Sequence, residues 1–170
     1  MRGNRFFRNG DGIVLDRGSD HNVIAKNRIA HAIQHPGRSD GQAIEVGPHS
    51  DHNVIARNSV RDTDGGGISL GFQHRALVGN LVRRNRIRGA GKDGVEVNAG
   101  AKHTLLRRNR TSHSKDDGFD VEGRTTKLTR NEALRNGDLG IEAVRGVIDG
   151  GGNRASGNGD LRQCTNIVCG

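Results

Sequence analysis

A short apolar motif recurs from one end of the chain to the other, and this periodicity constrains the fold more than any other feature. Each copy starts with Gly or Ala and carries apolar residues at its second and fourth positions. The six copies are GIVL (12–15), AIEV (43–46), GISL (67–70), GVEV (94–97), GFDV (118–121) and GIEA (140–143). A repeat of about two dozen residues cannot bury its own apolar side, whereas stacked copies can.

A second motif, which ends in asparagine, follows the first in each period. Its copies are NVIAKN (22–27), NVIARN (53–58), NLVRRN (80–85), TLLRRN (104–109) and TKLTRN (126–131). Both motifs alternate as β-strands do, and no helical period of useful length is present. The sequence therefore predicts an all-β fold, a single-stranded parallel β-helix (β-solenoid) of about six coils. We expect one domain over residues 1–170, with 154–170 as a C-terminal closing loop.

Stacking places equivalent residues in ladders about 4.8 Å apart. Three apolar ladders are predicted to form the core: Ile13, Ile44, Ile68, Val95, Phe119 and Ile141; Leu15, Val46, Leu70, Val97, Val121 and Ala143; and Ile24, Ile55, Val82, Leu106 and Leu128. A polar ladder is predicted at a bend: Asn27, Asn58, Asn85, Asn109, Asn131 and Asn153. Stacked amides can bond from coil to coil, which indicates a structural role for these asparagines.

The two motifs resemble those of the right-handed parallel β-helix repeat proteins of the pectate-lyase-like superfamily, over essentially the whole chain. The resemblance implies a right-handed solenoid. It does not imply one chemistry, because the superfamily includes polysaccharide lyases, glycoside hydrolases, uronate epimerases, adhesins and NosD-like periplasmic proteins. Secreted members are similar to this chain at its C-terminus, which implies export.

The two ends of the chain carry further signals. GNRFFRNGDGI (3–13) matches RNEALRNGDLGI (130–141), so we expect the chain to start inside a coil, with the N-terminal coil truncated. Cys164 and Cys169 lack the additional Cys or His ligands of a zinc site and are interpreted as a disulfide, with a reduced cytosolic pair as the alternative. A disulfide favours a secreted or cell-surface location. No apolar run is long enough to span a membrane, and no signal-peptide pattern follows Met1.

Two insertions interrupt the period. Seven extra residues lie within HAIQHPGRSDGQ (31–42), and a shorter insertion of three lies near GFQHRALVG (71–79). Loops that leave a regular solenoid often wall a binding cleft, although they can equally be neutral decoration.

The formal net charge of +8 favours a polyanionic partner: nucleic acid, anionic lipid or acidic polysaccharide. Four Phe with no Trp or Tyr offer few stacking platforms, which disfavours nucleic acid. The two signs of charge are predicted to lie on different faces. The outward column of the first motif reads Val14, Glu45, Ser69, Glu96, Asp120 and Glu142, whereas the column before the asparagines reads Lys26, Arg57, Arg84, Arg108 and Arg130.

The segment SKDDGFDVEG (114–123) concentrates the acidic residues. Like charges one rung apart repel by about 1 kcal/mol in water, and a hard cation would offset this repulsion. We therefore predict that Asp93, Asp116, Asp117 and Asp120 bind Ca²⁺, with a solvated acidic surface as the alternative. DDGFD is similar to the Asp-Asp-x-x-Asp calcium cluster of one pectate lyase family. Four glutamates are predicted to contact substrate: Glu45, Glu96, Glu122 and Glu142.

The resemblance implies a calcium-dependent lyase that acts on an acidic (uronate) polysaccharide by β-elimination, with a Lys or Arg as the base. No lysine occupies the family's position for this base, so Arg124 and Arg145 are the candidates. Glycoside hydrolysis by a carboxyl pair such as Asp93 and Asp117, and uronate epimerisation, are further alternatives. We expect a secreted polysaccharide-binding or polysaccharide-processing protein. The alternative is a non-catalytic carbohydrate-binding or structural module.

Overall fold

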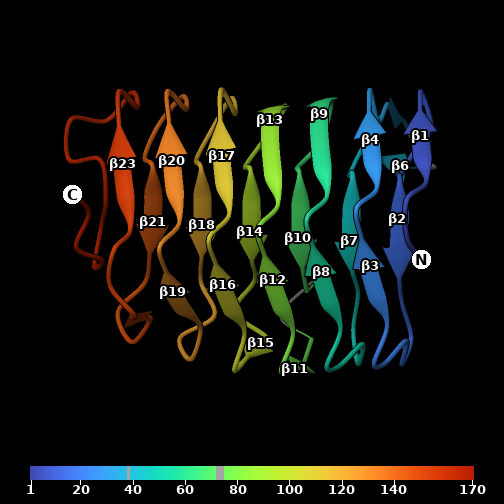
Figure 1. Cartoon of the computed structure of the whole chain (residues 1–170), viewed down its shortest axis with the longest axis horizontal. Helices are drawn as coiled ribbons and strands as arrows, with labels where there is room; N and C mark the ends of the chain where they lie inside the picture. The colour runs from blue at the N-terminus through green and yellow to red at the C-terminus, as the bar shows by residue number, and fades with distance from the viewer. Residues whose placement is uncertain (38, 72–74) are drawn as a thin grey trace.

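The computed structural model describes residues 1–37, 39–71 and 75–170, and within these ranges every regular element is a β-strand. The insertion expected near 71–79 therefore lies partly outside the described residues. The strands wind into a parallel solenoid whose coils follow one another along the long axis, from β1 at one end to β23 at the other (Figure 1). In the described part of the chain, no helix has the length and apolar character needed to cross a membrane.

Three parallel sheets form the walls of the solenoid. Sheet I contains β2 (Ile13–Leu15), β7 (Ile44–Val46), β10 (Ile68–Leu70), β14 (Val95–Val97), β18 (Phe119–Val121) and β21 (Ile141–Ala143). Sheet II contains β3 (Val23–Ala25), β8 (Val54–Ala56), β12 (Leu81–Arg83), β16 (Leu105–Arg107), β19 (Lys127–Thr129) and β22 (Ile148–Asp149). Sheet III contains β1 (Arg5–Phe7), β4 (Arg28–Ala30), β9 (Ser59–Thr63), β13 (Arg86–Ala90), β17 (Arg110–Ser112), β20 (Glu132–Leu134) and β23 (Arg154–Ser156).

Two small, two-stranded sheets lie outside these three walls. Strands β11 (Leu77–Val78) and β15 (Ala101–Lys102) pair in parallel beside the bend between sheets I and II. Strands β5 (Gln34–His35) and β6 (Ser39–Asp40) form an antiparallel hairpin. This hairpin is the first of the two predicted insertions, and it leaves the solenoid between β4 and β7.

The predicted apolar ladders are confirmed by the strand register. In sheet I, Ile44 pairs with Ile13 and Ile68, and Val95 pairs with Ile68 and Phe119. These side chains are buried, with Phe119 completely inaccessible to solvent. A fourth inward ladder, on sheet III, was not predicted: Ile29, Val60, Ile87, Thr111, Ala133 and Ala155. Its residues lie two positions after each ladder asparagine. The ladder is harder to recognise in the sequence because the large apolar residues of the first coils are replaced by Ala in the last two.

The asparagine ladder is also confirmed, and it lies at the bend between sheets II and III. In each rung, Oδ1 of one asparagine accepts both the backbone N–H and the Nδ2 of the preceding one, as Asn109 does from Asn85 at 3.0 Å for each bond. The residue before each of the first five asparagines is left-handed; at Arg84, for example, φ is 55°. Such a backbone costs about 1–2 kcal/mol for a non-glycine residue, and the amide bonds offset this cost. A second ladder, through Asn22, Asn53 and Asn80, was missed.

The C-terminal segment packs against the last coil. Bridges join Ile141 to Cys164 and Asn153 to Cys169, so the segment continues the solenoid after β23. The predicted disulfide between Cys164 and Cys169 is present, and Ile167 between them is buried. The role of residues 154–170 as a closing loop stays a prediction.

Replacing both cysteines with serine is expected to lower the free energy of unfolding by about 2 kcal/mol, because the crosslink closes a short loop in the unfolded chain. Urea unfolding of the oxidised protein, the reduced protein and the double Cys164→Ser, Cys169→Ser variant measures this loss. Reduction and substitution should shift the midpoint equally. An unchanged midpoint would show that the disulfide does not stabilise the last coil.

Candidate functional site

The outward side of sheet I carries a row of carboxyl groups. The middle residues of its strands are in register, so that Glu96 pairs with Ser69 on one side and Asp120 on the other, and Asp120 pairs with Glu142. We call this surface the acidic face, defined by seven residues from sheet I and the turns before it: Glu45, Glu96, Asp120, Glu142, Asp93, Asp116 and Asp117. Ser69 interrupts the row and donates its hydroxyl to Oε2 of Glu96 at 2.9 Å.

Three of the four predicted metal ligands meet in the turns before β14 and β18. One carboxylate oxygen from each of Asp93, Asp116 and Asp117 lies within 4.8 Å of the others. Asp120 is not part of this group, because it lies on β18 itself and projects from the acidic face. The prediction of an aspartate cluster that could hold a metal ion is therefore supported for these three residues.

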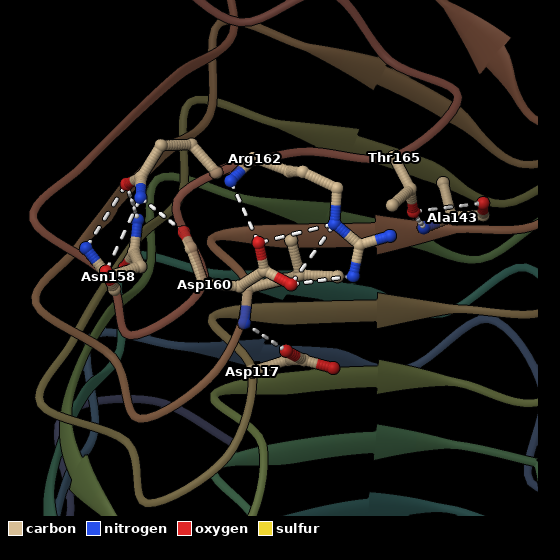
Figure 2. A network of polar contacts seen from close by, with 8 residues as sticks. Asp117, Ala143, Asn158, Asp160, Arg162 and Thr165 are labelled. Carbon is tan, nitrogen blue, oxygen red and sulfur yellow. Dashed lines mark hydrogen bonds and ion pairs between the residues drawn. The ribbon is translucent and has the colours of Figure 1, made fainter.

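Two of the three aspartates also hold neighbouring coils together. Oδ1 of Asp93 accepts the backbone N–H of Asp117 at 3.0 Å. Oδ1 of Asp117 in turn accepts the backbone N–H of Leu139 at 2.7 Å, the dashed contact drawn at Asp117 in Figure 2. Asp11 accepts the N–H of Gln42 in the same way. These backbone bonds use Oδ1 of each residue, and the carboxyl of Asp117 also hydrogen-bonds to that of Glu142. Together with Asp116, the carboxylates of Asp93 and Asp117 are the hard oxygen donors that Ca²⁺ or Mg²⁺ prefers.

Burial, together with neighbouring carboxyls, raises the pKa values of Asp93, Asp117 and Asp120. Burial raises the pKa of Asp117 to about 8, although the hydrogen bond from Leu139 lowers it, and a hydrogen bond with Glu142 raises it further. Burial, followed by the charge of Asp93, raises the pKa of Asp120 to about 7. Burial also raises the pKa of Asp93 to about 6, against the hydrogen bond from Asp117. Asp117 and Asp120 can therefore give or take protons near neutral pH.

A hollow of about 220 Å³ lies on the acidic face, toward the N-terminus from the three aspartates. Its lining combines charges of both signs with neutral polar groups: Asp40, Gln42, Glu45, Ser69, Gly71, Lys92, Glu96 and Asn98. Asp40 and Gln42 come from the insertion, which thus walls a hollow as one of its two interpretations predicted. Gln42 is only 8% exposed, and its Oε1 has no hydrogen-bond partner among the described residues.

The hollow contains residues that the sequence analysis did not select. Lys92 is the cation in its lining, and Asn98 and Gln42 supply amides. Lys92 directly precedes Asp93 in the sequence, and this position next to a predicted metal ligand could have marked it as a site residue. Nothing in the sequence indicated Gln42, because it lies in an insertion that interrupts the repeat.

The other predicted site residues lie along or beyond sheet I. Glu122 follows β18 and is half-buried, whereas Arg124 and Arg145 lie in the exposed turns after β18 and β21. Gly146 packs against the side chain of Arg124, so the two turns are neighbours. The three-residue strand β18, which rises about 10 Å, separates Arg124 from Asp117. The two arginines therefore lie at the opposite end of the sheet I strands from the three aspartates.

Comparisons with known proteins agree with this architecture. Residues 43–167 match the profile of a family described as the right-handed β-helix region. Comparison with curated protein sequences gives no significant match.

Several solved structures of a periplasmic alginate epimerase, AlgG, are similar to the chain. One structure of this epimerase superposes with a TM-score of 0.74 at 21% identity and covers 96% of this chain and 40% of the epimerase. A double mutant of the epimerase has a TM-score of 0.74 at 20% identity, with coverages of 97% and 45%. The chain thus spans less than half the length of these structures, and at this identity the likeness concerns the fold. Because the profile covers most of the chain and the three parallel sheets wind as it describes, this chain belongs to the right-handed β-helix family.

Proposed function

We propose that the acidic face acts on an acidic, uronate-containing polysaccharide outside the cytoplasm. The observation that carries the proposal is the row of Glu96, Asp120 and Glu142 on one sheet, beside a hollow that contains Lys92. Such a surface offers acid–base groups for a sugar ring and a cation for its carboxylate. The likeness to a periplasmic alginate epimerase supports a uronate as substrate, and the disulfide supports an oxidising location.

The proposed reaction begins with removal of the C5 proton, next to the uronate carboxylate. β-Elimination and C5 epimerisation share this step. Asp120 is our candidate for the acid–base group, because it projects from the middle of the acidic face between Glu96 and Glu142. Lys92 would hold the uronate carboxylate, while Glu45 and Glu96 would bind hydroxyl groups. Arg124 and Arg145, at the far ends of the strands, remain alternative bases, and Glu122 and Glu142 remain candidate substrate contacts.

The aspartates before sheet I fit a hard divalent cation, and Ca²⁺ is our proposal for it. Asp93, Asp116 and Asp117 would supply three oxygens of the six to eight that Ca²⁺ takes, and backbone carbonyls, water or substrate would complete the shell. When bound, the ion neutralises a uronate carboxylate and thereby makes the C5 proton more acidic. The chain's own contribution is to orient the polymer across the acidic face and to move the proton through Asp120.

Deuterium uptake at C5 and formation of unsaturated product together test the shared step, because epimerisation returns a hydrogen to C5 whereas elimination leaves a double bond there. The protein is incubated in D₂O with polymannuronate, polyguluronate or polygalacturonate, with calcium or with chelator, and NMR follows deuterium at C5 while absorbance follows unsaturated products. We expect deuterium uptake or unsaturated product from at least one polymer, and a loss of this activity of at least about 100-fold for Asp120→Asn. Asp62→Asn, which changes an exposed aspartate on sheet III, is the matched control and should keep full activity. Binding with neither deuterium uptake nor unsaturated product in the unsubstituted protein would instead identify a non-catalytic module.

A further inference from the structure

Two identical segments place six arginines on neighbouring coils. The sequence R-R-N-R occurs at 83–86 and again at 107–110. The strand register stacks Arg83 on Arg107 and Arg86 on Arg110, and the N–H of Arg84 donates to the carbonyl of Arg107. We call these residues the arginine cluster: Arg83, Arg84, Arg86, Arg107, Arg108 and Arg110. Because the asparagine of each segment belongs to the buried ladder, the arginines around it point to solvent, and all six are exposed.

The arginine cluster is short of negative partners. Among the described residues its one ion pair joins Arg110 to Glu132 at 3.4 Å, and both side chains are well exposed. The charge of Arg107, followed by that of Arg130, lowers the pKa of the Arg108 guanidinium. Two like charges 4 Å apart repel by about 1 kcal/mol in water. Anions bound from outside would remove this repulsion.

The surface around the cluster is hollowed along the solenoid axis. A depression of about 70 Å³ lies between Arg83, Arg84, Arg107 and Arg108, at the bend between sheets II and III. A larger groove of about 520 Å³ continues from Arg86 and Arg110 over sheet III toward Arg135. In Figure 1 the strands that carry the cluster, β12, β13, β16 and β17, face the viewer in the middle of the solenoid, and sheet I lies behind them. The cluster and the acidic face are therefore on different sides of the molecule.

We propose that the arginine cluster and the groove beside it bind a linear carboxylated polysaccharide that lies along the solenoid axis. Guanidinium groups match carboxylates through two parallel hydrogen bonds. The coils repeat every 4.8 Å or so, which is close to the length of one sugar ring, and each uronate ring carries one carboxylate. Nucleic acid fits less well, because the cluster contains no aromatic side chain on which a base could stack. The inference rests on the proposed function for the identity of the polymer and does not require catalysis.

This arrangement assigns the two charged sides different tasks. The arginine cluster would hold the polymer by charge, while the acidic face would bind a uronate only where Lys92 or a cation neutralises the carboxylate. An anionic polymer near the protein therefore reaches the arginine cluster first, and this raises its local concentration at the solenoid.

Charge reversal at Arg83 and Arg107 tests the assignment. Isothermal titration of size-defined oligouronates against the whole chain should show an affinity that weakens with salt, and Arg83→Glu with Arg107→Glu should weaken it at least about tenfold. The matched control, Arg17→Glu with Lys102→Glu, changes the net charge equally at exposed positions outside the arginine cluster and should alter the affinity less than about twofold. Thermal melting verifies that both variants are folded.

Three results would overturn the proposal. Equal losses of affinity in the two double variants would show that binding depends only on net charge. Unchanged affinity in the Arg83 and Arg107 variant, with a loss in Asp120→Asn, would place all polymer binding on the acidic face. Tighter binding of a thymidine oligonucleotide than of oligouronates, lost in the same variant, would make the cluster a nucleic-acid site. Failure of the proposed catalysis looks different, because oligouronate binding then persists with neither deuterium uptake nor unsaturated product.

Discussion

Replacing Asn109 with alanine is expected to destabilise the solenoid by roughly 3–5 kcal/mol, because buried polar groups on three coils lose partners. Oδ1 of Asn109 accepts the backbone N–H and the Nδ2 of Asn85, both at 3.0 Å. Its own Nδ2 donates to the carbonyl of Val82 at 2.9 Å and to Oδ1 of Asn131 at 3.1 Å. Asn109 is only 1% exposed, so these bonds lie away from bulk solvent.

Urea unfolding of Asn109→Ala measures the loss. Asn22→Ala is the control, because Asn22 lies in the other ladder and is half-buried, so water can replace its bonds. We expect the control to lose about 1 kcal/mol or less. A similarly small loss for Asn109→Ala would mean that backbone pairing and apolar packing alone hold the bend between sheets II and III.

Replacing Asp117 with asparagine should have the opposite effect on stability at alkaline pH. The amide oxygen can still accept the N–H of Leu139, as the ladder asparagines do for their neighbours, while the buried charge beside Asp93 and Glu142 is removed. We expect a gain on the order of 2 kcal/mol at pH 8, which is a rise in Tm of several degrees. Asp62→Asn, at an exposed position, should leave Tm unchanged.

The pH dependence of this effect follows from the direction of the pKa shift. The pKa of Asp117 is about 8 in the folded protein and near the ordinary value of 3.8 when unfolded. Between these values the folded state binds more protons, so the free energy of unfolding falls as pH rises. Wild type should therefore lose stability between about pH 4 and pH 8, and Asp117→Asn should show a shallower loss. If stability changed with pH in the same way in the two proteins, the raised pKa of Asp117 would be contradicted.

Calcium provides a second readout of the same substitution. A ligand of the folded state stabilises wild type by about 2.7 kcal/mol at a concentration 100 times its Kd. Asp117→Asn should lose most of this gain, because a neutral amide replaces one of the three carboxylates. The gain should also vanish at acidic pH, where protons occupy the oxygens. Equal calcium-induced shifts in both proteins would show that the ion does not bind at Asp93, Asp116 and Asp117.

The two charged sides have a common structural origin. Each coil contributes one outward residue to the middle of sheet I and one to the bend before each ladder asparagine. A preference for acidic or for basic residues at one repeat position therefore becomes a column of like charges. At the bend this produces the arginine cluster, and on sheet I it produces the row of Glu96, Asp120 and Glu142. Stacking thus turns a preference at one repeat position into a surface that a polymer can follow.

The amino-acid sequence was sufficient to predict the solenoid, three core ladders, the asparagine ladder and the sorting of charge. The reason is that a strict period leaves one register in which every apolar position faces inward, and this register also decides which residues share a column. Phe119 and Asn109 could be placed in this way because each has an equivalent in nearly every coil. The disulfide was also predictable, since Cys164 and Cys169 are the only cysteines.

Only the tertiary structure decided how the candidate site is built. It buried Asp117 under Leu139 and left Asp120 outside the three-aspartate group, a difference that depends on how each turn bends. It also brought Asp40 and Gln42 from the hairpin insertion to the hollow beside Lys92. An insertion does not obey the repeat, so its side chains are positioned by packing between coils, and that information is absent from the spacing of residues along the chain.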